Sequence, residues 1–504
     1  MTRDPGEASA HMPVKIHQLT TPLRTAWRHG TLWPWCLAAT AAVCGYAVST
    51  VFHPGYFSSD SNYQLWQALG DQPVSDWHPA VLTLVWRGLL RTTGDLSAMA
   101  DLQIAVFWGS LWLLARLVWK KTASRPLSLA MLSVGLAPHI MNFTGVVWKD
   151  VHLAYALLAA CAIAFTAREL PEGRTKTRWA LFALGVLFIV YAGMVRKNGF
   201  PAVVPVFALL VLALWPAPGR RRWLAATGVL AAVTVAGSLG VNAIAHPLQT
   251  RVYAVIPVDD LVHVLTPAQV GDAAEQAGGS ADFRDRMVTA AIRCQKRNIP
   301  SDAYLQCYPY HRPFDVMELS RNADVLVRMW SRQMPRHWQG YAEYRTRVFT
   351  KLLFQDNQAF RNGSSVNRSA QLHPMAAKEP PNKALRSALR NYVTGFVRDL
   401  PMLFQGWFWL AVALVLVLRR RWPGPYSREL RLLGASSLVY VLAYLPTAPE
   451  SNYRYVYWPA LSGTVALVLI ASAYAARRRT AAKTTVPAPG RATAPEPAPA
   501  GVPA

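Results

Sequence analysis

Long runs without a charged side chain recur along most of this chain of 504 residues. A helix rises about 1.5 Å per residue and the apolar core of a bilayer is about 30 Å thick, so a run of about 20 apolar residues can cross a membrane. Nine runs lack Asp, Glu, Lys and Arg, and one further run carries only Arg116 near its end: 29–59, 126–148, 151–167, 179–195, 198–219, 223–250, 400–418, 432–449 and 455–476, with 102–119 as the tenth. We therefore predict an all-α polytopic membrane protein with about ten transmembrane helices.

Lys and Arg gather in alternate connections between these runs. They follow the second, fourth, sixth, eighth and tenth spans, as with Lys120 and Lys121 after the second and Arg220 to Arg222 after the sixth. Connections rich in Lys and Arg stay in the cytoplasm, so we predict that both termini are cytoplasmic. The formal net charge of +25, from 52 basic and 27 acidic residues, then reflects topology and contact with the lipid bilayer rather than binding to nucleic acid.

The charge pattern also divides the chain into segments. The predicted segments are a cytoplasmic N-terminus (1–30), a transmembrane module with seven spans (31–250) that includes a first outer loop (52–100), a mostly helical outer domain (251–399), a second transmembrane module (400–476) and a Pro/Ala-rich disordered tail (477–504). Within the first outer loop, the apolar stretch from Pro79 to Leu90 carries Arg87, which favours an interfacial helix over a span.

Two of the five cysteines fall in the predicted outer domain. Cys294 and Cys307 are 13 positions apart, and an oxidising compartment would allow them to close a short loop as a disulfide. The alternative is that they are two unrelated thiols.

Polar residues cluster where the predicted spans meet the outer face, and the first outer loop holds two such sets. Asp60 is the only carboxylate of the sequence GYFSSDSNYQLW, where it is either a functional base or, with Ser59, a cap of a helix over 61–69. His78 follows Asp76 and precedes Pro79, and it either binds a phosphate or sugar hydroxyl or caps the interfacial helix.

Three further sets lie at the outer ends of later spans. Lys149 and Asp150 stand at the entrance of the fourth span, where the ordinary interpretation is a solvated pair. Arg196, Lys197 and Asn198 form a short outer turn between the fifth and sixth spans, and two cations on that side oppose the charge rule unless they meet an anion such as a lipid phosphate. The last set lies before the final span and contains Glu450, Arg454 and Tyr455. The predicted topology brings all five sets to one face.

In the order of these features, the sequence resembles the GT-C glycosyltransferase superfamily, in particular the bacterial relatives of protein mannosyltransferases and the aminoarabinose transferase. The resemblance covers roughly residues 30–220. It consists of Asp60 after the first span, His78 and Pro79 opening a juxtamembrane helix, Asp150 entering the fourth span, and the turn with Arg196, Lys197, Gly199 and Pro201; the pair Arg454 and Tyr455 before the last span also recurs in such enzymes.

The resemblance implies an inverting transfer of a sugar from a polyprenyl-phosphate donor to an acceptor of the cell envelope. Asp60 would be the general base, with Asp150 as the second choice, and His78, Lys149, Arg196, Lys197, Asn198, Arg454 and Tyr455 would bind the substrates and the donor phosphate. It also implies a bacterial inner membrane with the active face in the periplasm. Many relatives carry two adjacent acids in the first loop, but Ser61 and Asn62 follow Asp60 here, so a divalent metal has no support in the sequence.

Two other classes of protein remain as alternatives. An O-antigen ligase or polymerase also combines many spans with a large outer loop, and its chemistry would rest on residues such as His337 and Arg345. A transporter or flippase would place charges or broken helices in mid-membrane. The sequence does not name the sugar or the acceptor.

Overall fold

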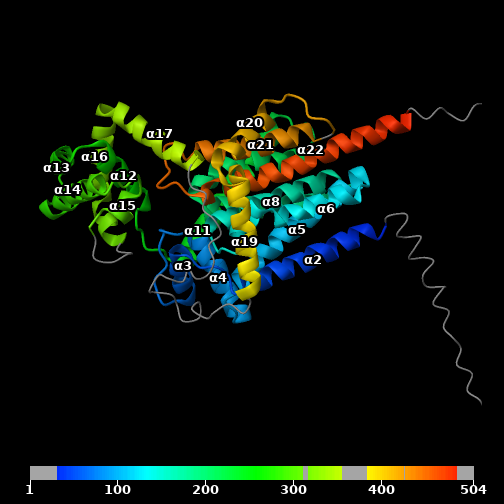
Figure 1. Cartoon of the computed structure of the whole chain (residues 1–504), viewed down its shortest axis with the longest axis horizontal. Coiled ribbons are helices and arrows are strands. Elements are labelled where there is room, and N and C mark those ends of the chain that lie inside the picture. The colour runs from blue at the N-terminus through cyan, green and yellow to red at the C-terminus, as the bar shows by residue number, and fades with distance from the viewer. Residues whose placement is uncertain (1–30, 310–315, 355–382, 425, 485–504) are drawn as a thin grey trace, which may run out of the picture.

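The computed structural model describes residues 31–309, 316–354, 383–424 and 426–484. Within these ranges the regular structure is helical, with two isolated β-bridges, so the predicted all-α class is confirmed for this part of the chain. The helices form a bundle of long helices and a smaller helical domain beyond one end of it, which we call the domain end of the bundle (Figure 1). The predicted N-terminal segment 1–30 lies outside the described residues.

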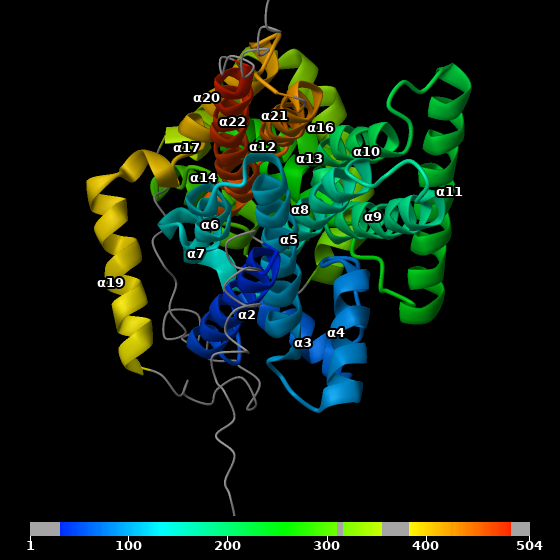
Figure 2. The ribbon, with the colours of Figure 1, turned by 90° about the vertical axis from the view of Figure 1, so that its right-hand side faces the viewer.

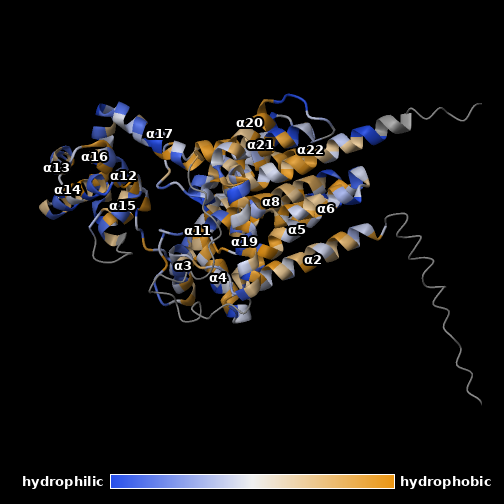
Figure 3. Cartoon of the chain, viewed as in Figure 1, coloured by the Kyte–Doolittle hydropathy of each residue, from blue (hydrophilic) through white to orange (hydrophobic). Residues whose placement is uncertain are grey.

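Seven helical segments are long and apolar enough to cross a membrane, and an eighth is added if one bent pair of helices counts as a single span. The seven are Trp33–Phe52 (α2), Ala98–Thr122 (α5), Lys149–Arg168 (α8), Thr175–Val195 (α9), Lys197–Leu214 (η2, Lys197–Gly199, and α10, Phe200–Leu214), Arg220–Ala245 (α11) and Tyr453–Arg479 (η5, Tyr453–Val456, and most of α22, Tyr457–Thr484). Their apolar residues dominate the bundle in Figure 3. These helices are compatible with a membrane protein, but the predicted count of ten spans is not confirmed.

Three of the ten predicted spans differ from single long helices. The run 126–148 is divided into α6 (Arg125–Ser133) with η1 (Val134–Leu136) and α7 (Pro138–Thr144), and the two parts are bent by 48°. Pro138 at the start of α7 has no backbone N–H and cannot continue the preceding helix. The other two predicted spans, 400–418 and 432–449, correspond to helices that are shorter than the seven: α20 (Gly406–Leu418) has 13 residues and α21 (Ser427–Leu442) has 16. Thirteen residues cover only about 20 Å.

The bundle is built around α8, and α11 lies at its edge. In α8, 94% of the span is buried, whereas in α11 only 11% is buried. The central half of α8 is rich in alanine, and small side chains allow neighbouring helices to approach closely. Figure 2 shows α11 beside α9, on the opposite side of the bundle from α19 (Lys383–Asp399). Helix α11 therefore packs against the bundle over only a small part of its surface.

The smaller domain has its own hydrophobic core. Its elements are η3 (Val252–Ala254), α12 (Val255–Val264), α13 (Pro267–Gln276), α14 (Ala281–Lys296), α15 (Ala303–Gln306) and α16 (Val316–Arg336). Cys294 at the end of α14 and Cys307 after α15 are buried in this core and form a disulfide, with their Cα atoms 5.4 Å apart.

The predicted outer domain 251–399 contributes to both bodies. Helix α17 (Trp338–Phe354) leaves the smaller domain, and its Tyr344 and Val348 belong to the core of the bundle. Helix α19 also packs on the bundle through Val393, and Arg386 donates hydrogen bonds to the carbonyl groups of Val51 and His53 at the end of α2. The turn η4 (Pro401–Phe404) then leads into α20.

Two segments of the predicted loops and tail are helical. The first outer loop folds into α3 (Ser59–Leu69) and α4 (Ala80–Thr93), and α4 corresponds to the predicted interfacial helix. The tail was predicted to be disordered from residue 477, but residues 477–484 continue α22, and the rest of the tail lies outside the described residues. Tyr56 bridges to Val146 and Ser75 bridges to Leu248, which tie both ends of α3 to the bundle.

Candidate functional site

Asp60 lies in the first turn of α3 but does not cap the helix. The N-cap is Ser58, whose hydroxyl accepts a hydrogen bond from the backbone N–H of Ser61, and Ser61 returns a contact to the backbone of Ser58. The alternative in which Ser59 or Asp60 caps this helix is therefore wrong, because the capping box places the N-cap one residue earlier, at Ser58. The carboxylate of Asp60 is left available for other contacts.

Asp60 meets Arg454 at the domain end of the bundle. Arg454 Nη1 lies 2.9 Å from Asp60 Oδ2, and Arg454 Nη2 lies 2.8 Å from Glu450 Oε1. The guanidinium stands over the rings of Trp148 and Tyr455, with its carbon 5.1 Å from each ring centroid. Two carboxylates and two aromatic faces thus fix Arg454 in one orientation.

A second ion pair lies beside the first. Arg196 Nη1 is 2.9 Å from Asp150 Oδ1, and Arg196 Nε donates to the hydroxyl of Tyr444. Asp150 is completely buried and Arg196 is only 8% exposed. We predicted a catalytic role for Asp150 and phosphate binding for Arg196. This geometry instead favours mutual neutralisation, because the charge of each side chain is already paired with that of the other.

Two further side chains act on Asp60. Lys149 is half-buried and forms no ion pair or hydrogen bond with any other described residue, yet its charge interacts with Asp60. His78 is buried, and its ring centroid lies 5.5 Å from that of Tyr63 with the two rings tilted by 56°. Its Nδ1 has no hydrogen-bond partner in the described part of the chain. We call Asp60, His78, Lys149, Glu450 and Arg454 the Asp60 cluster.

Charge and burial set the protonation states of Asp60 and His78. Burial acts to raise the pKa of Asp60, but the positive charge and hydrogen bond of Arg454, with Lys149, leave it well below its usual range. Burial lowers the pKa of His78 to about 3, and Lys149 adds to this shift. At neutral pH the site therefore holds an ionised Asp60 and an uncharged imidazole.

A cleft of about 290 Å³ opens next to His78, between α4, α9, α10 and α11. Its walls are largely apolar, with Met194, Leu230 and Val241 among them, and polar groups stand along it, including His78 and Lys197. His78 thus belongs to both the cleft and the Asp60 cluster. Lys197 is exposed, whereas the half-buried Asn198 makes no hydrogen bond with another described residue.

The smaller domain contributes one residue that the sequence did not indicate. Asp302 precedes α15 with φ of 63° and interacts electrostatically with Glu450 and Arg454. Burial, followed by the charges of Glu450 and Asp259, raises the pKa of Asp302 to about 8. A single aspartate in a loop has no distinguishing sequence pattern, so only the packing of the domain against the bundle identifies it.

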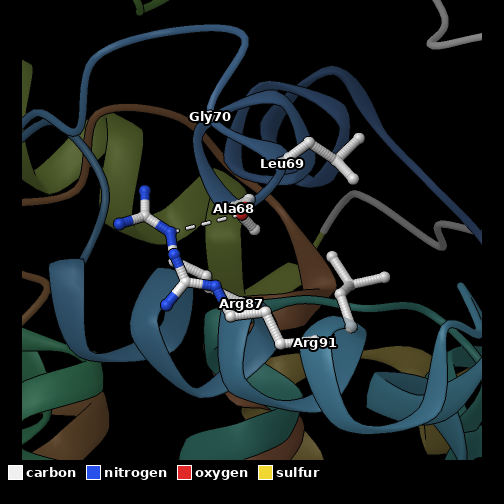
Figure 4. Close-up of a pocket in the computed structure, with 6 residues that line it drawn as sticks. Ala68, Leu69, Gly70, Arg87 and Arg91 are labelled. Atoms are coloured by element: carbon white, nitrogen blue, oxygen red, sulfur yellow. Dashed lines mark hydrogen bonds between the residues drawn. The ribbon is translucent and has the colours of Figure 1, made fainter.

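A second cavity, of about 370 Å³, lies between α3 and α4 (Figure 4). Arg87 and Arg91 line one side of it, and Arg87 donates hydrogen bonds to the carbonyl groups of Gln67 and Ala68 at the end of α3. Arg87 thereby satisfies carbonyl groups that a helix end leaves without partners. None of the predicted site residues lines this cavity.

Comparison of the chain with family models, with curated proteins and with solved structures finds no match. The resemblance to the GT-C superfamily therefore rests on the order of the motifs alone. Among the described residues, no three His, Cys, Asp or Glu side chains are grouped so that they could hold a metal ion.

Proposed function

We propose that this protein is a membrane glycosyltransferase that moves a sugar from a polyprenyl-phosphate carrier to an acceptor of the cell envelope. The observation that carries the proposal is the Asp60 cluster, in which an ionised carboxylate and a fixed guanidinium lie 2.9 Å apart beside an apolar cleft. A base, a phosphate-binding cation and a space for a lipid chain are the three parts that this reaction needs.

The chemistry follows from these groups. Asp60 takes the proton of the acceptor hydroxyl while the acceptor oxygen attacks the anomeric carbon, and the bond between that carbon and the phosphate oxygen breaks. The leaving group is polyprenyl phosphate, whose negative charge is stabilised by Arg454 and Lys149. General-base assistance typically contributes about 10²–10⁴-fold, and each well-placed donor to the developing charge contributes about 10²–10³-fold.

Donor binding would also make Asp60 a stronger base. In the absence of substrate, Arg454 holds the pKa of Asp60 low, so this carboxylate is a poor proton acceptor. A donor phosphate that shares Arg454 and Lys149 neutralises part of their charge, and the pKa of Asp60 then rises towards its usual range. The base is therefore activated only when the leaving group is in place.

The apolar cleft suits the isoprenoid chain of the donor. Its walls between α9, α10 and α11 belong to helices apolar enough to span a membrane, so a chain in the cleft would remain in an apolar environment. Lys197 and His78 stand along the same cleft, where the carrier phosphate would lie. With the Lys- and Arg-rich ends in the cytoplasm, the Asp60 cluster faces the periplasm of a bacterial inner membrane, and both termini are cytoplasmic.

The test compares cells that lack the gene with cells that carry the wild type, Asp60→Asn or a control, Asp95→Asn. Asp95 is exposed in the turn between α4 and α5. Loss of the gene should remove one sugar from an envelope glycan and cause a polyprenyl-phosphate sugar to accumulate, and only wild type and Asp95→Asn should restore both. Unchanged glycans and lipid carriers in the deletion strain would refute the proposal.

A further inference from the structure

Two neighbouring carboxylates on α12 connect the smaller domain to the bundle. Asp260 Oδ1 lies 2.6 Å from Arg345 Nη2 on α17, and both side chains are almost completely buried, at 0% and 4% exposure. The indole N–H of Trp330 on α16 donates to the other oxygen of Asp260 at 2.7 Å. Asp260 therefore joins α12, α16 and α17 at a single buried point.

Arg345 extends this connection to the site. Its Nη1 donates a hydrogen bond of 2.8 Å to the carbonyl oxygen of Ala448, in the loop between α21 and η5. Two residues further along this loop, Glu450 binds Arg454, which binds Asp60. An unbroken series of contacts thus runs from the smaller domain to the candidate base.

The neighbouring Asp259 fixes a second loop at the same face. Its Oδ1 accepts from the backbone N–H of Ala303 at 2.8 Å, and its Oδ2 accepts from the hydroxyl of Tyr344 at 2.5 Å. Ala303 follows Asp302, which interacts with Glu450 and Arg454. Adjacent residues of α12 thereby hold the two loops that carry Asp302 and Glu450.

We propose that Asp260 and Arg345 are positioning residues, which hold the loop 446–452 so that Glu450 fixes Arg454 against Asp60. This inference deepens the proposed function and rests on it for the role of Arg454 in phosphate binding. The guanidinium is suited to the task because its planar fork presents separate N–H groups to a carboxylate and to a carbonyl oxygen at once. The smaller domain becomes part of the site, and its docking on the bundle sets the geometry of Arg454.

The first test measures the loop directly and needs no substrate. Hydrogen–deuterium exchange followed by mass spectrometry is applied to the full-length protein in nanodiscs as wild type, Arg345→Ala and Arg336→Ala. Arg336 is exposed at the end of α16 and serves as the control. Arg345→Ala should speed exchange within 446–452 by about tenfold, the effect expected from losing a hydrogen bond to a charged donor. Exchange within α8 should not change.

Wild-type exchange at 446–452 in Arg345→Ala would overturn the inference, as would equal acceleration throughout the bundle. If Arg345→Ala does not fold, Arg345→Lys provides the test, because a lysine keeps the charge but cannot form both contacts in one plane. Arg345→Lys should then show faster exchange in this loop alone, and wild-type exchange there would overturn the inference.

The second test asks whether Arg345 acts through Arg454. Binding of polyprenyl phosphate to the protein in nanodiscs is measured for Arg345→Ala, Arg454→Ala and the double variant. Arg345→Ala should weaken binding about tenfold in the wild type and less than about twofold when Arg454 is absent, as expected for coupled residues. Equal weakening in both backgrounds would overturn the positioning role. If the probe does not bind the wild type, the proposed function fails while the exchange result stands.

Discussion

Two ion pairs lie side by side at the domain end of the bundle, and they differ in exposure. Asp150 and Arg196 are 0% and 8% exposed, and Tyr444 supplies a further hydrogen bond. Asp60 and Arg454 are 31% and 14% exposed, and Glu450 competes for the same guanidinium. The first pair is closed to solvent, whereas the second is accessible and shares its cation.

The difference separates structural from functional charge. A buried pair without water access must remain paired, since an isolated buried charge is strongly disfavoured. An accessible pair in which two carboxylates share one arginine can release a partner when an anion arrives, because the arginine keeps a counterion throughout. We therefore interpret the Asp150–Arg196 pair as the support and the Asp60 cluster as the site.

The largest expected effect is on stability and concerns the buried pair. Asp150→Ala leaves the guanidinium of Arg196 buried without a counterion, which should destabilise the protein by about 3–5 kcal/mol. Asp60→Ala leaves Arg454 paired with Glu450 and should cost less than about 1 kcal/mol. Thermal unfolding of both variants in nanodiscs measures the contrast. Equal losses of stability would abolish the distinction between the two pairs.

The next effect is on activity and concerns the accessible pair. Asp60→Asn keeps the size and hydrogen-bonding capacity of the side chain but removes the base, so sugar transfer should fall by about 10²-fold or more. The unfolding temperature should stay near that of the wild type, because Ser58 and not Asp60 caps α3. Transfer by purified protein into an acceptor is the measurement. Retained activity in Asp60→Asn would show that Asp60 is not the base and that another carboxylate must be.

A smaller effect is expected on donor binding. Lys149→Ala and Arg454→Ala each remove one cation from the Asp60 cluster, and the loss of a charged hydrogen bond costs about 1.5–3 kcal/mol. Each variant should therefore bind polyprenyl phosphate at least about tenfold more weakly. Lys176→Ala, an exposed lysine at the start of α9, provides the control. Wild-type affinity in both cluster variants would indicate that Lys149 and Arg454 have a structural role and do not bind the phosphate.

The last expected effect is a pH dependence of stability that arises through Asp302, which interacts with Arg454 of the accessible pair. Its pKa is raised from 3.8 to about 8, so the folded protein binds this proton more tightly than the unfolded chain does. Asp302 by itself should then make stability decrease as the pH rises from about 4 to about 8, and Asp302→Asn should remove this contribution. The unfolding temperature at the two ends of this range, with exposed Asp272→Asn as control, tests the sign. If the unfolding temperature of Asp302→Asn depends on pH as that of the wild type does, the raised pKa of Asp302 would be contradicted.

Much of the fold could be predicted from the charge-free runs alone. Each run coincides with a helical region, because apolar residues without charges favour helices in an apolar environment. The count of spans was less predictable. The run 126–148 is as apolar as the others, but Pro138 allows a bend there, and packing against neighbouring helices decides whether the two parts align.

The candidate site could be predicted in its members but not in its pairing. Asp60 and Arg454 are 394 positions apart, and no local pattern joins them. The same limitation applies to Asp150 and Arg196, for which sequence patterns predicted separate roles in catalysis and phosphate binding. Which carboxylate meets which arginine depends on small differences in helix rotation that periodicity does not resolve.

The sequence by itself determined the helical class, the apolar runs and the end of the bundle at which polar groups gather. These properties follow from the cost of placing charges and free backbone groups in an apolar medium, which acts on each segment separately. The tertiary structure alone decided that Asp150 forms a buried ion pair with Arg196 and that Asp60 remains accessible beside the cleft. It also decided that Asp302 of the smaller domain interacts with the Asp60 cluster. Contacts between distant residues depend on how whole helices and domains pack, because ion pairs act over a few ångströms while the packing sets those distances.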